Sequence, residues 1–317
     1  MHDIVDRPAL VANRTPSTNL WLNFRRHWQL YVLMLLPVAY MVIFRYIPMA
    51  GLVIAFKRYR VTQGIFGSEW VGFHYFAKFF TTASARRTIT NTIVLSLYGL
   101  FAGFPFPIML AILINETKSV VFKKSVQLVT YAPYFISTVV FVGLLYQFLD
   151  LRSGFVNHLL TLIGFEPINF MGKAQYWRHV YVWSGIFQHT GYGAVIYIAA
   201  LAAINPELYE AAIIDGASRV QRIWHIDIPG ILSTIVILFI LNTGRIMTVG
   251  FEKAYLMQNN INLVRSEIIA TFVYKVGLQQ MEYSFSTAVG LFNALVNLIL
   301  LATVNQIARH ISETSLW

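Results

Sequence analysis

Residues 210–229 read EAAIIDGASRVQRIWHIDIP and form a polar stretch within a strongly apolar chain. Its ionisable residues are Glu210, Asp215, Arg219, Arg222, His225 and Asp227. The stretch is too polar to cross a bilayer, because each charged side chain is costly in the hydrocarbon core. Apolar segments precede and follow it, so its place in the fold depends on what those segments are.

The rest of the chain has the composition of a membrane protein. Of its 317 residues, 57% are hydrophobic and 12% are charged, and the mean hydropathy is +0.59. The charged fraction is about half that of an ordinary soluble domain, so we expect an all-α polytopic membrane protein. The net charge of +10 is then explained by Lys and Arg that flank the spans and meet anionic lipid, and we expect no nucleic-acid partner.

Several chemistries are absent from the sequence. There is no cysteine, and the histidines do not have metal-ligand spacing, so we expect no metal site. The chain has neither a GxxxxGK[ST] phosphate-binding loop nor a GxSxG nucleophile elbow. We therefore expect no catalytic residue, no enzyme activity and no cofactor in this chain.

Six segments have the roughly 20 apolar residues that a spanning helix needs. Residues 1–29 precede them as a polar tail, and residues 30–317 form a six-helix domain. Pro105 and Pro107 predict a kink in the second span, because neither residue donates a backbone hydrogen bond. The aromatic-rich connection 57–88 predicts short helices at the membrane interface. Lys and Arg are spread almost evenly over the two sides, so charge does not decide the orientation. The predicted spans are residues 30–46 (with an extension toward 56 left open), 89–114, 126–149, 179–204, 231–251 and 286–307.

The polar stretch belongs to a predicted pair of short helices between the fourth and fifth spans. Asn205 is a good N-cap and Pro206 suits a first turn, so a helix is expected over 205–214. Asp215-Gly216 predicts a turn, and a second helix follows over 217–226 until Pro229 stops it. Shape alone leaves open whether this is an ordinary interfacial loop or a docking element.

The spacing within this loop resembles the cytoplasmic signature of permease subunits of ATP-binding-cassette (ABC) importers. That signature is EAA, three residues, Gly, nine residues, then I-x-L-P. Here it is Glu210-Ala211-Ala212, Gly216, Ile226 and Pro229, with Ile228 in the Leu position. The Asp215-Gly216-Ala217 triplet is typical of carbohydrate importers. Other segments, such as TYAPYFIST (130–138) and YSFSTAVGLFNALVNLILL (283–301), resemble the polysaccharide and oligosaccharide subfamily, and the likeness extends from about residue 30 to residue 317.

The resemblance implies a type I importer permease fold with six spans, in the inner membrane of a bacterium, with both termini cytoplasmic. It implies that residues 205–230 dock on an ATP-hydrolysing subunit and couple hydrolysis to movement of the spans. The implied partners are a second homologous permease, two ATP-binding subunits that hold ATP and Mg, an extracytoplasmic solute-binding protein and lipid. The coupling residues would be Glu210, Ala211, Ala212, Asp215, Gly216, Ala217, Ile226 and Pro229.

Polar residues inside the spans are candidates for the transport pathway, because burying them in lipid is costly. Amides suit sugar hydroxyls and aromatic rings stack on sugar rings. Each also has a structural interpretation: Asn293 and Asn297 could join helices by hydrogen bonds, and Arg245 could pair with Glu252. The candidates are Gln188, His189, Tyr192, Asn242, Arg245, Glu252, Asn293 and Asn297.

The substrate is less well defined than the class. In the subfamily that the chain resembles, position 245 is more often Asn and position 189 is often acidic. The cationic character here fits an anionic fragment such as an alginate-like uronate, as in alginate-importer permeases, while a neutral oligosaccharide stays open. A different class also stays open, namely an ATP-independent secondary transporter or channel in which His189, Arg245 and Glu252 form an ion relay.

Overall fold

The computed structural model is largely helical and describes residues 25, 27–244 and 246–311. Most of the expected N-terminal tail and the candidate Arg245 therefore lie outside the described residues. The chain divides into two units, residues 1–52 and 53–317.

The first predicted span is a continuous helical run, Trp28–Phe56, of 29 residues. The run extends to Phe56, as the sequence left open. Its most apolar stretch is not buried within the structure, so these side chains need lipid or another protein around them. It comprises α2 (Trp28–Met41), η1 (Val42–Tyr46), α3 (Ile47–Met49) and η2 (Ala50–Phe56).

The aromatic connection contains the short helices that the sequence predicts. Its elements are β1 (Lys57–Arg58), α4 (Gly64–Gly67), β2 (Glu69–Trp70) and α5 (His74–Thr81). The two strands pair antiparallel, with Lys57 opposite Trp70. The Phe56 ring stacks on the Trp70 ring with 5.7 Å between centroids, so aromatic packing closes this connection.

The second span is a 33-residue run, Ala83–Asn115. It is divided at Phe104 into α6 (Ala83–Gly103) and α7 (Pro105–Asn115). The interruption lies where Pro105 and Pro107 remove two backbone donors. Phe104 keeps helical dihedral angles, so the predicted kink stays a prediction.

The third predicted span, residues 126–149, is not one straight helix. The chain forms α8 (Val120–Tyr131) and η3 (Ala132–Phe135), and α9 (Thr138–Phe148) then departs at 102°. Ile136 and Ser137 are extended, and the Ser137 hydroxyl accepts a hydrogen bond from the Val140 N–H at 3.4 Å. Ser137 thus caps a new helix, and the sequence prediction of a continuous span was wrong here. The short helix α10 (Phe155–Leu162) follows α9.

The fourth span, α11 (Ala174–Ala202), packs against α6, α7 and α8. Gly191 allows the closest approach, because a Cβ atom there would lie 2.0 Å from the Thr130 carbonyl oxygen. Ala111, Ala194, Tyr197, Leu201 and Ile231 form a buried cluster between α7, α11 and the start of the fifth span. The helix α11 is therefore the central element of the second unit.

The fifth predicted span, residues 231–251, is shorter than expected. Its helix, α15, ends at Thr243, and residues beyond it lead into a group of short helices. The sixth span is the long helix α19. By length and composition the structure has three spanning helices, or up to six if each bent pair is one span. The remaining elements are α12 (Pro206–Ile214), α13 (Arg219–Arg222), η4 (Ile223–Asp227), α14 (Ile228–Gly230), α15 (Leu232–Thr243), α16 (Phe251–Met257), α17 (Leu263–Ser266), α18 (Ile269–Tyr274), η5 (Lys275–Gln279) and α19 (Tyr283–Ile311).

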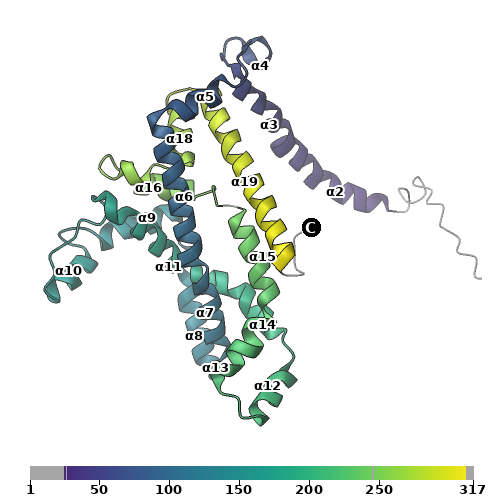
Figure 1. Cartoon of the computed structure of the whole chain (residues 1–317), viewed down its shortest axis with the longest axis vertical. Helices are drawn as coiled ribbons and strands as arrows, with labels where there is room; N and C mark the ends of the chain where they lie inside the picture. Colours follow the sequence, from purple (N-terminus) through teal and green to yellow (C-terminus); the bar gives the residue numbers. More distant parts are fainter. Residues whose placement is uncertain (1–24, 26, 245, 312–317) are drawn as a thin grey trace, which may run out of the picture. The chain divides into compact units, whose positions relative to one another are not determined.

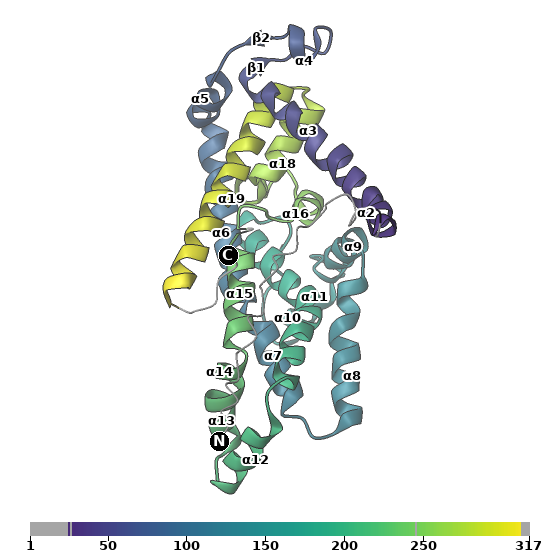
Figure 2. The ribbon, with the colours of Figure 1, turned by 90° about the vertical axis from the view of Figure 1, so that its right-hand side faces the viewer.

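Within the second unit, the polar stretch lies at one end. Both views place α12 and α13 at this end and α5 and α18 at the other (Figures 1 and 2). The helices α11 and α15, which precede and follow the polar stretch, run from this end toward the middle of the unit.

Candidate functional site

The first helix of the loop 205–230 begins as its sequence predicts. The Asn205 side chain accepts a hydrogen bond from the Glu207 N–H and donates one to the Glu207 carboxylate, both at 3.1 Å. Pro206 occupies the first turn of α12, where its missing N–H costs nothing. The acidic Glu207 lies at the positive end of the helix dipole.

The turn after α12 depends on glycine. Gly216 has φ +77°, a left-handed conformation that glycine adopts without the steric cost of a Cβ. The Ala217 N–H bonds to the Ala212 carbonyl at 2.8 Å and closes the helix end. The second helix then begins with a capping box of Ser218 and Gln221, a start signal that the sequence reading missed.

The second helix ends in a π-helical turn, η4, two residues before Pro229. The same pattern occurs in the first span, where the π turn η1 ends at Tyr46, two residues before Pro48. A wider turn relieves the clash between a proline ring and the carbonyl of the preceding turn. In the loop it places Asp227 in the interior, fully buried.

Two side-chain contacts hold the loop in its shape. The Tyr209 hydroxyl donates to Asp227 Oδ1, which joins the first helix to the second. Arg222 forms an ion pair with Glu116 at 3.4 Å, which joins the second helix to the end of α7. The burial of Tyr209 and its bond to Asp227 raise the pKa of the tyrosine hydroxyl, so it stays a donor.

The outer surface of the loop is unusually apolar for a segment with so many charges. Leu208, Ile213, Ile214, Val220 and Trp224 are all more than half exposed, and Ile214 reaches 85%. Exposed apolar side chains of this kind indicate a surface that another protein or a membrane covers.

The predicted coupling residues all lie in this loop. The half-buried members are Ala212, Ala217 and Ile226. The exposed members are Glu210, Ala211, Asp215, Gly216 and Pro229.

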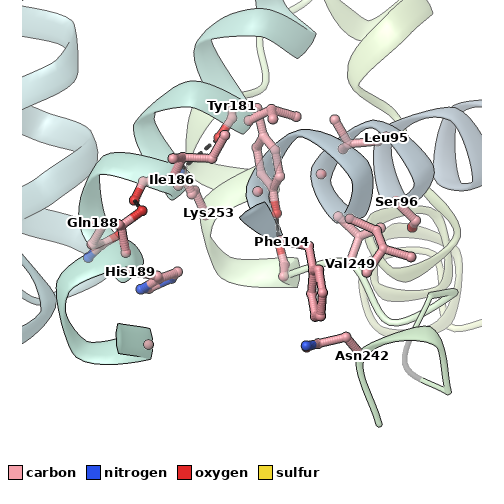
Figure 3. Close-up of a pocket in the computed structure, with 18 of the residues that line it drawn as sticks. Leu95, Ser96, Phe104, Tyr181, Ile186, Gln188, His189, Asn242, Val249 and Lys253 are labelled. Carbon is pink, nitrogen blue, oxygen red and sulfur yellow. Dashed lines mark hydrogen bonds between the residues drawn. The ribbon is translucent and has the colours of Figure 1, made fainter. Parts of the chain in front are cut away.

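A second feature is an open cavity of about 850 Å³ in the middle of the unit (Figure 3). Its walls come from α6, α7, α11, α15 and the segment that follows α15. It is large enough for a sugar fragment, since small-molecule sites commonly have about 300–1,000 Å³.

Four of the predicted pathway residues line the cavity, namely Gln188, His189, Asn242 and Glu252. Gln188 is 5% exposed and donates to the Ile136 carbonyl at 3.2 Å, so it also fixes the bend between α8 and α9. His189 is exposed, and its ring lies 5.8 Å from that of Tyr134 between centroids.

The other predicted pathway residues lie elsewhere. Tyr192 is stacked on Tyr134, with 3.9 Å between parallel rings, outside the cavity wall. Asn297 accepts from the Met247 N–H at 3.0 Å and donates to the Thr248 hydroxyl at 3.2 Å. Its contacts agree with the helix-joining interpretation. Asn293, one turn away, does not line the cavity either, and Arg245 is outside the described residues.

One cavity residue was missed. Lys253 lies in α16, is 8% exposed and lines the cavity wall (Figure 3). It was not identified from the sequence as a candidate for the pathway. The signal that could have identified it is its position in the sequence. Lys253 directly follows Glu252, a pathway candidate, and lies two residues past the fifth predicted span, 231–251.

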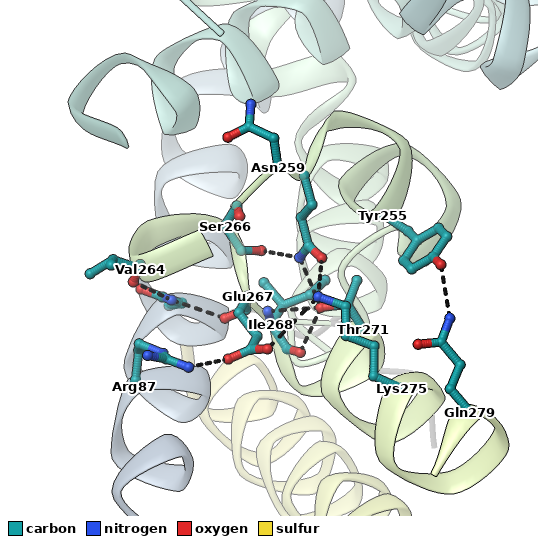
Figure 4. A network of polar contacts seen from close by, with 12 residues as sticks. Arg87, Tyr255, Asn259, Val264, Ser266, Glu267, Ile268, Thr271, Lys275 and Gln279 are labelled. Atoms are coloured by element: carbon teal, nitrogen blue, oxygen red, sulfur yellow. Dashed lines mark hydrogen bonds and ion pairs between the residues drawn. The ribbon is translucent and has the colours of Figure 1, made fainter. Parts of the chain in front are cut away.

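A partly buried polar network fixes the segment that follows α16 (Figure 4). Glu267 forms ion pairs with Arg87 of α6 and, at 3.8 Å, with Lys275. Asn91 of α6 donates to the carbonyls of Glu267 at 2.9 Å and Val264 at 3.0 Å. The segment that follows α16 is therefore anchored to α6.

A helical membrane bundle with a central cavity and a loop at one end that exposes apolar side chains fits a class, the transmembrane subunits of transport systems. The sequence profile of the family described as "Binding-protein-dependent transport system inner membrane component" matches residues 77–313, and the chain belongs to this family. This confirms the resemblance to importer permeases. Among curated proteins, the chain is 40% identical over 313 residues to Protein LplB of Bacillus subtilis (strain 168), covering 98% of each.

Two further relatives are informative. The polygalacturonan/rhamnogalacturonan transport system permease protein YteP of Bacillus subtilis (strain 168) is 40% identical, covering 98% of this chain and 96% of that one. A solved bacterial ABC transporter "involved in the import of the acidic polysaccharide alginate" contains a chain with 38% identity and a TM-score of 0.87, over 92% of this chain and 99% of that one. The same TM-score is found for an alginate transporter in complex with an "alginate pentasaccharide-bound periplasmic protein".

Proposed function

We propose that this chain forms half of the transmembrane pathway of an ATP-driven ABC importer for oligosaccharides or polysaccharide fragments, with acidic uronate sugars as the preferred class. The observation that carries the proposal is the connectivity of the loop 205–230. It joins α11, which supplies Gln188 and His189 to the cavity, directly to the helices leading to α15, which supplies Asn242.

This connectivity supports a coupling mechanism. A subunit that binds the exposed apolar face of the loop would displace two walls of the cavity together, α11 and α15. The Arg222–Glu116 pair adds α7, a third wall. Closure of ATP-bound partners would thus move the cavity walls as rigid bodies, which is how alternating access operates. ATP and Mg belong to those partners, and the loop side of the membrane, with both termini, is the cytoplasmic side.

The substrate class is supported by the relatives and by the cavity. Two of the relatives described above transport acidic polysaccharides by their names or descriptions. The cavity combines amides with aromatic walls and a lysine, which suits sugar hydroxyls, ring faces and carboxylates. The role of Arg245 as a further cation stays a prediction.

The test is reconstitution with the implied partners, which are a second permease, the ATP-binding subunits and a solute-binding protein. The purified complex should retain the ATPase subunits in detergent, and its ATP hydrolysis should rise with loaded binding protein. Uronate oligosaccharides should stimulate more than neutral ones, and Arg245→Asn should reduce that difference. Failure to retain any ATPase, together with sugar uptake driven by an ion gradient, would instead indicate the ATP-independent transporter, with His189 and Glu252 in the cavity as relay groups.

A further inference from the structure

We infer that Lys253 forms a carboxylate-binding subsite in the cavity, which contacts a uronate group of the sugar while it passes through this subunit. The inference rests on the proposed function and adds the residue that would give this subunit its charge preference. It starts from the environment of the Lys253 ammonium.

The ammonium of Lys253 is held in an aromatic and backbone cage. Its Nζ donates to the Tyr181 carbonyl at 3.0 Å and lies 4.9 Å from the Tyr181 ring centroid and 5.4 Å from that of Phe141. Gly185, one turn further along α11, leaves room for it, because a Cβ there would lie 3.3 Å from Nζ. The fold therefore builds a fixed position for a positive charge at the cavity wall.

This charge has no counterion within the described part of the chain. The ion pairs found there join Arg58 to Glu69, Arg87 to Glu267, Arg222 to Glu116 and Lys275 to Glu267. Lys275, on a neighbouring element, differs from Lys253 in this respect. Its ammonium has a counterion, Glu267, and also donates a hydrogen bond to Gln258 at 2.9 Å. A buried cation without an anion is costly, and an anionic ligand would offset that cost.

The groups around Lys253 suit a sugar acid. An ammonium has three N–H donors, and the Tyr181 carbonyl takes one. His189 offers a ring nitrogen in the same cavity, and Asn242 offers an amide for hydroxyls. Figure 3 shows these side chains around the cavity. A carboxylate bound at Lys253 would accept a charge-assisted hydrogen bond.

Glu252 places a negative charge in the same cavity. Adjacent residues on a helix point roughly 100° apart, so the Glu252 and Lys253 side chains lie on different parts of the cavity wall. The subsite is consequently local, a contact for one carboxylate, and does not require a cavity of net positive charge.

The test uses the complete complex in lipid nanodiscs, without nucleotide or binding protein. The probes are trigalacturonate and its methyl ester, which share the same sugar backbone but differ in charge, since each carboxyl group of the ester carries a methyl group. The variants are Lys253→Gln, which keeps a donor for the Tyr181 carbonyl, Lys253→Arg, which keeps the charge, and Lys57→Met as a control. Lys57 also donates to a backbone carbonyl, that of Ile65 at 2.8 Å, but lies outside the cavity.

Calorimetry should show that Lys253→Gln weakens trigalacturonate binding by at least about tenfold, the usual effect of losing a charge-assisted bond. Binding of the methyl ester should change by less than about twofold, within the scatter of a surface substitution. Lys253→Arg and Lys57→Met should both retain the preference for the acid.

Three results would overturn the inference. The first is an equal loss of affinity for the acid and the ester in Lys253→Gln, which would mean that Lys253 only joins α16 to α11 structurally. The second is an unchanged affinity for the acid in Lys253→Gln. The third is a wild-type complex that imports oligosaccharide but does not bind trigalacturonate at millimolar concentration. In all three, retained ATPase subunits and retained import leave the proposed importer function intact, although the third result counts against uronates as the preferred class. A complex with neither would contradict the importer function itself.

Discussion

Arg222 Nη2 lies 3.4 Å from Glu116 Oε2, which bonds the second helix of the loop 205–230 to the residue that ends α7. Both side chains are largely buried, at 16% and 17% exposure. If the loop moves as proposed, this contact would carry its displacement directly to α7. Glu116→Gln keeps the shape of the side chain but removes its charge. We expect sugar import per ATP hydrolysed to fall several-fold, since a hydrogen bond to a charged group contributes about 1.5–3 kcal/mol.

The control for this variant is Glu69→Gln, which neutralises the Arg58–Glu69 pair. That pair is 50% and 64% exposed, and exposed pairs contribute little. Parallel measurement of uptake and phosphate release in proteoliposomes separates the two cases. Equal effects of both substitutions, or an unchanged ratio for Glu116→Gln, would show that the Glu116–Arg222 contact does not transmit motion.

Gly216→Ala should weaken attachment of the ATPase subunits. The left-handed φ of +77° at Gly216 costs an alanine about 1 kcal/mol, so the turn between α12 and α13 would shift toward another geometry. We expect about a fivefold loss of ATPase affinity, measured by the concentration of ATPase subunit that restores hydrolysis. Gly143→Ala is the matched control, because Gly143 has no positive φ and an added Cβ meets no atom within 4 Å. Similar losses in both variants would argue against the turn geometry.

Tyr209→Phe should destabilise the protein through Asp227. The tyrosine hydroxyl donates to a carboxylate that is fully buried, and a buried acceptor that loses its donor costs about 1–3 kcal/mol. The thermal unfolding midpoint in detergent should fall. Asp227→Asn should lower the unfolding midpoint less in the Tyr209→Phe background than in the wild type, because the stability effects of residues in contact are not additive. Tyr192→Phe keeps its ring stacked on Tyr134 and should leave the midpoint nearly unchanged. Strict additivity would contradict the coupling.

The parts of the fold that could be predicted from sequence are those set by local chemistry. Asn205 and Pro206 predicted the start of α12, and Gly216 predicted the turn, because caps and left-handed turns depend on a few adjacent residues. The proline pair at 105 and 107 predicted the interruption at Phe104 for the same reason.

The parts that could not be predicted depend on packing. Residues 126–149 are mostly apolar, so hydropathy predicted one span, although the extended Ile136 and Ser137 turn the chain by 102°. Their geometry is stabilised by Gln188 on α11, which donates to the Ile136 carbonyl, and such a long-range contact is invisible to hydropathy. Lys253 was missed for a related reason. Its burial comes from Tyr181 and Phe141 on other helices, whereas its place in the sequence is just outside the fifth predicted span, 231–251.

The contact between α11 and α8 gives a prediction about the central helix. Gly191 lies where an added Cβ would be 2.0 Å from the Thr130 carbonyl oxygen and 2.9 Å from the Tyr131 nitrogen. These are backbone atoms and cannot rotate away, so Gly191→Ala must separate the two helices. We expect the free energy of unfolding to fall by about 1–3 kcal/mol, which is typical of an overpacked core. The measurement is the unfolding midpoint of the purified complex, which should be lower. Gly290→Ala in α19 is the matched control, since an added Cβ there meets no atom within 4 Å. If both alanine variants unfold at the wild-type temperature, α11 and α8 do not pack as closely as this contact requires.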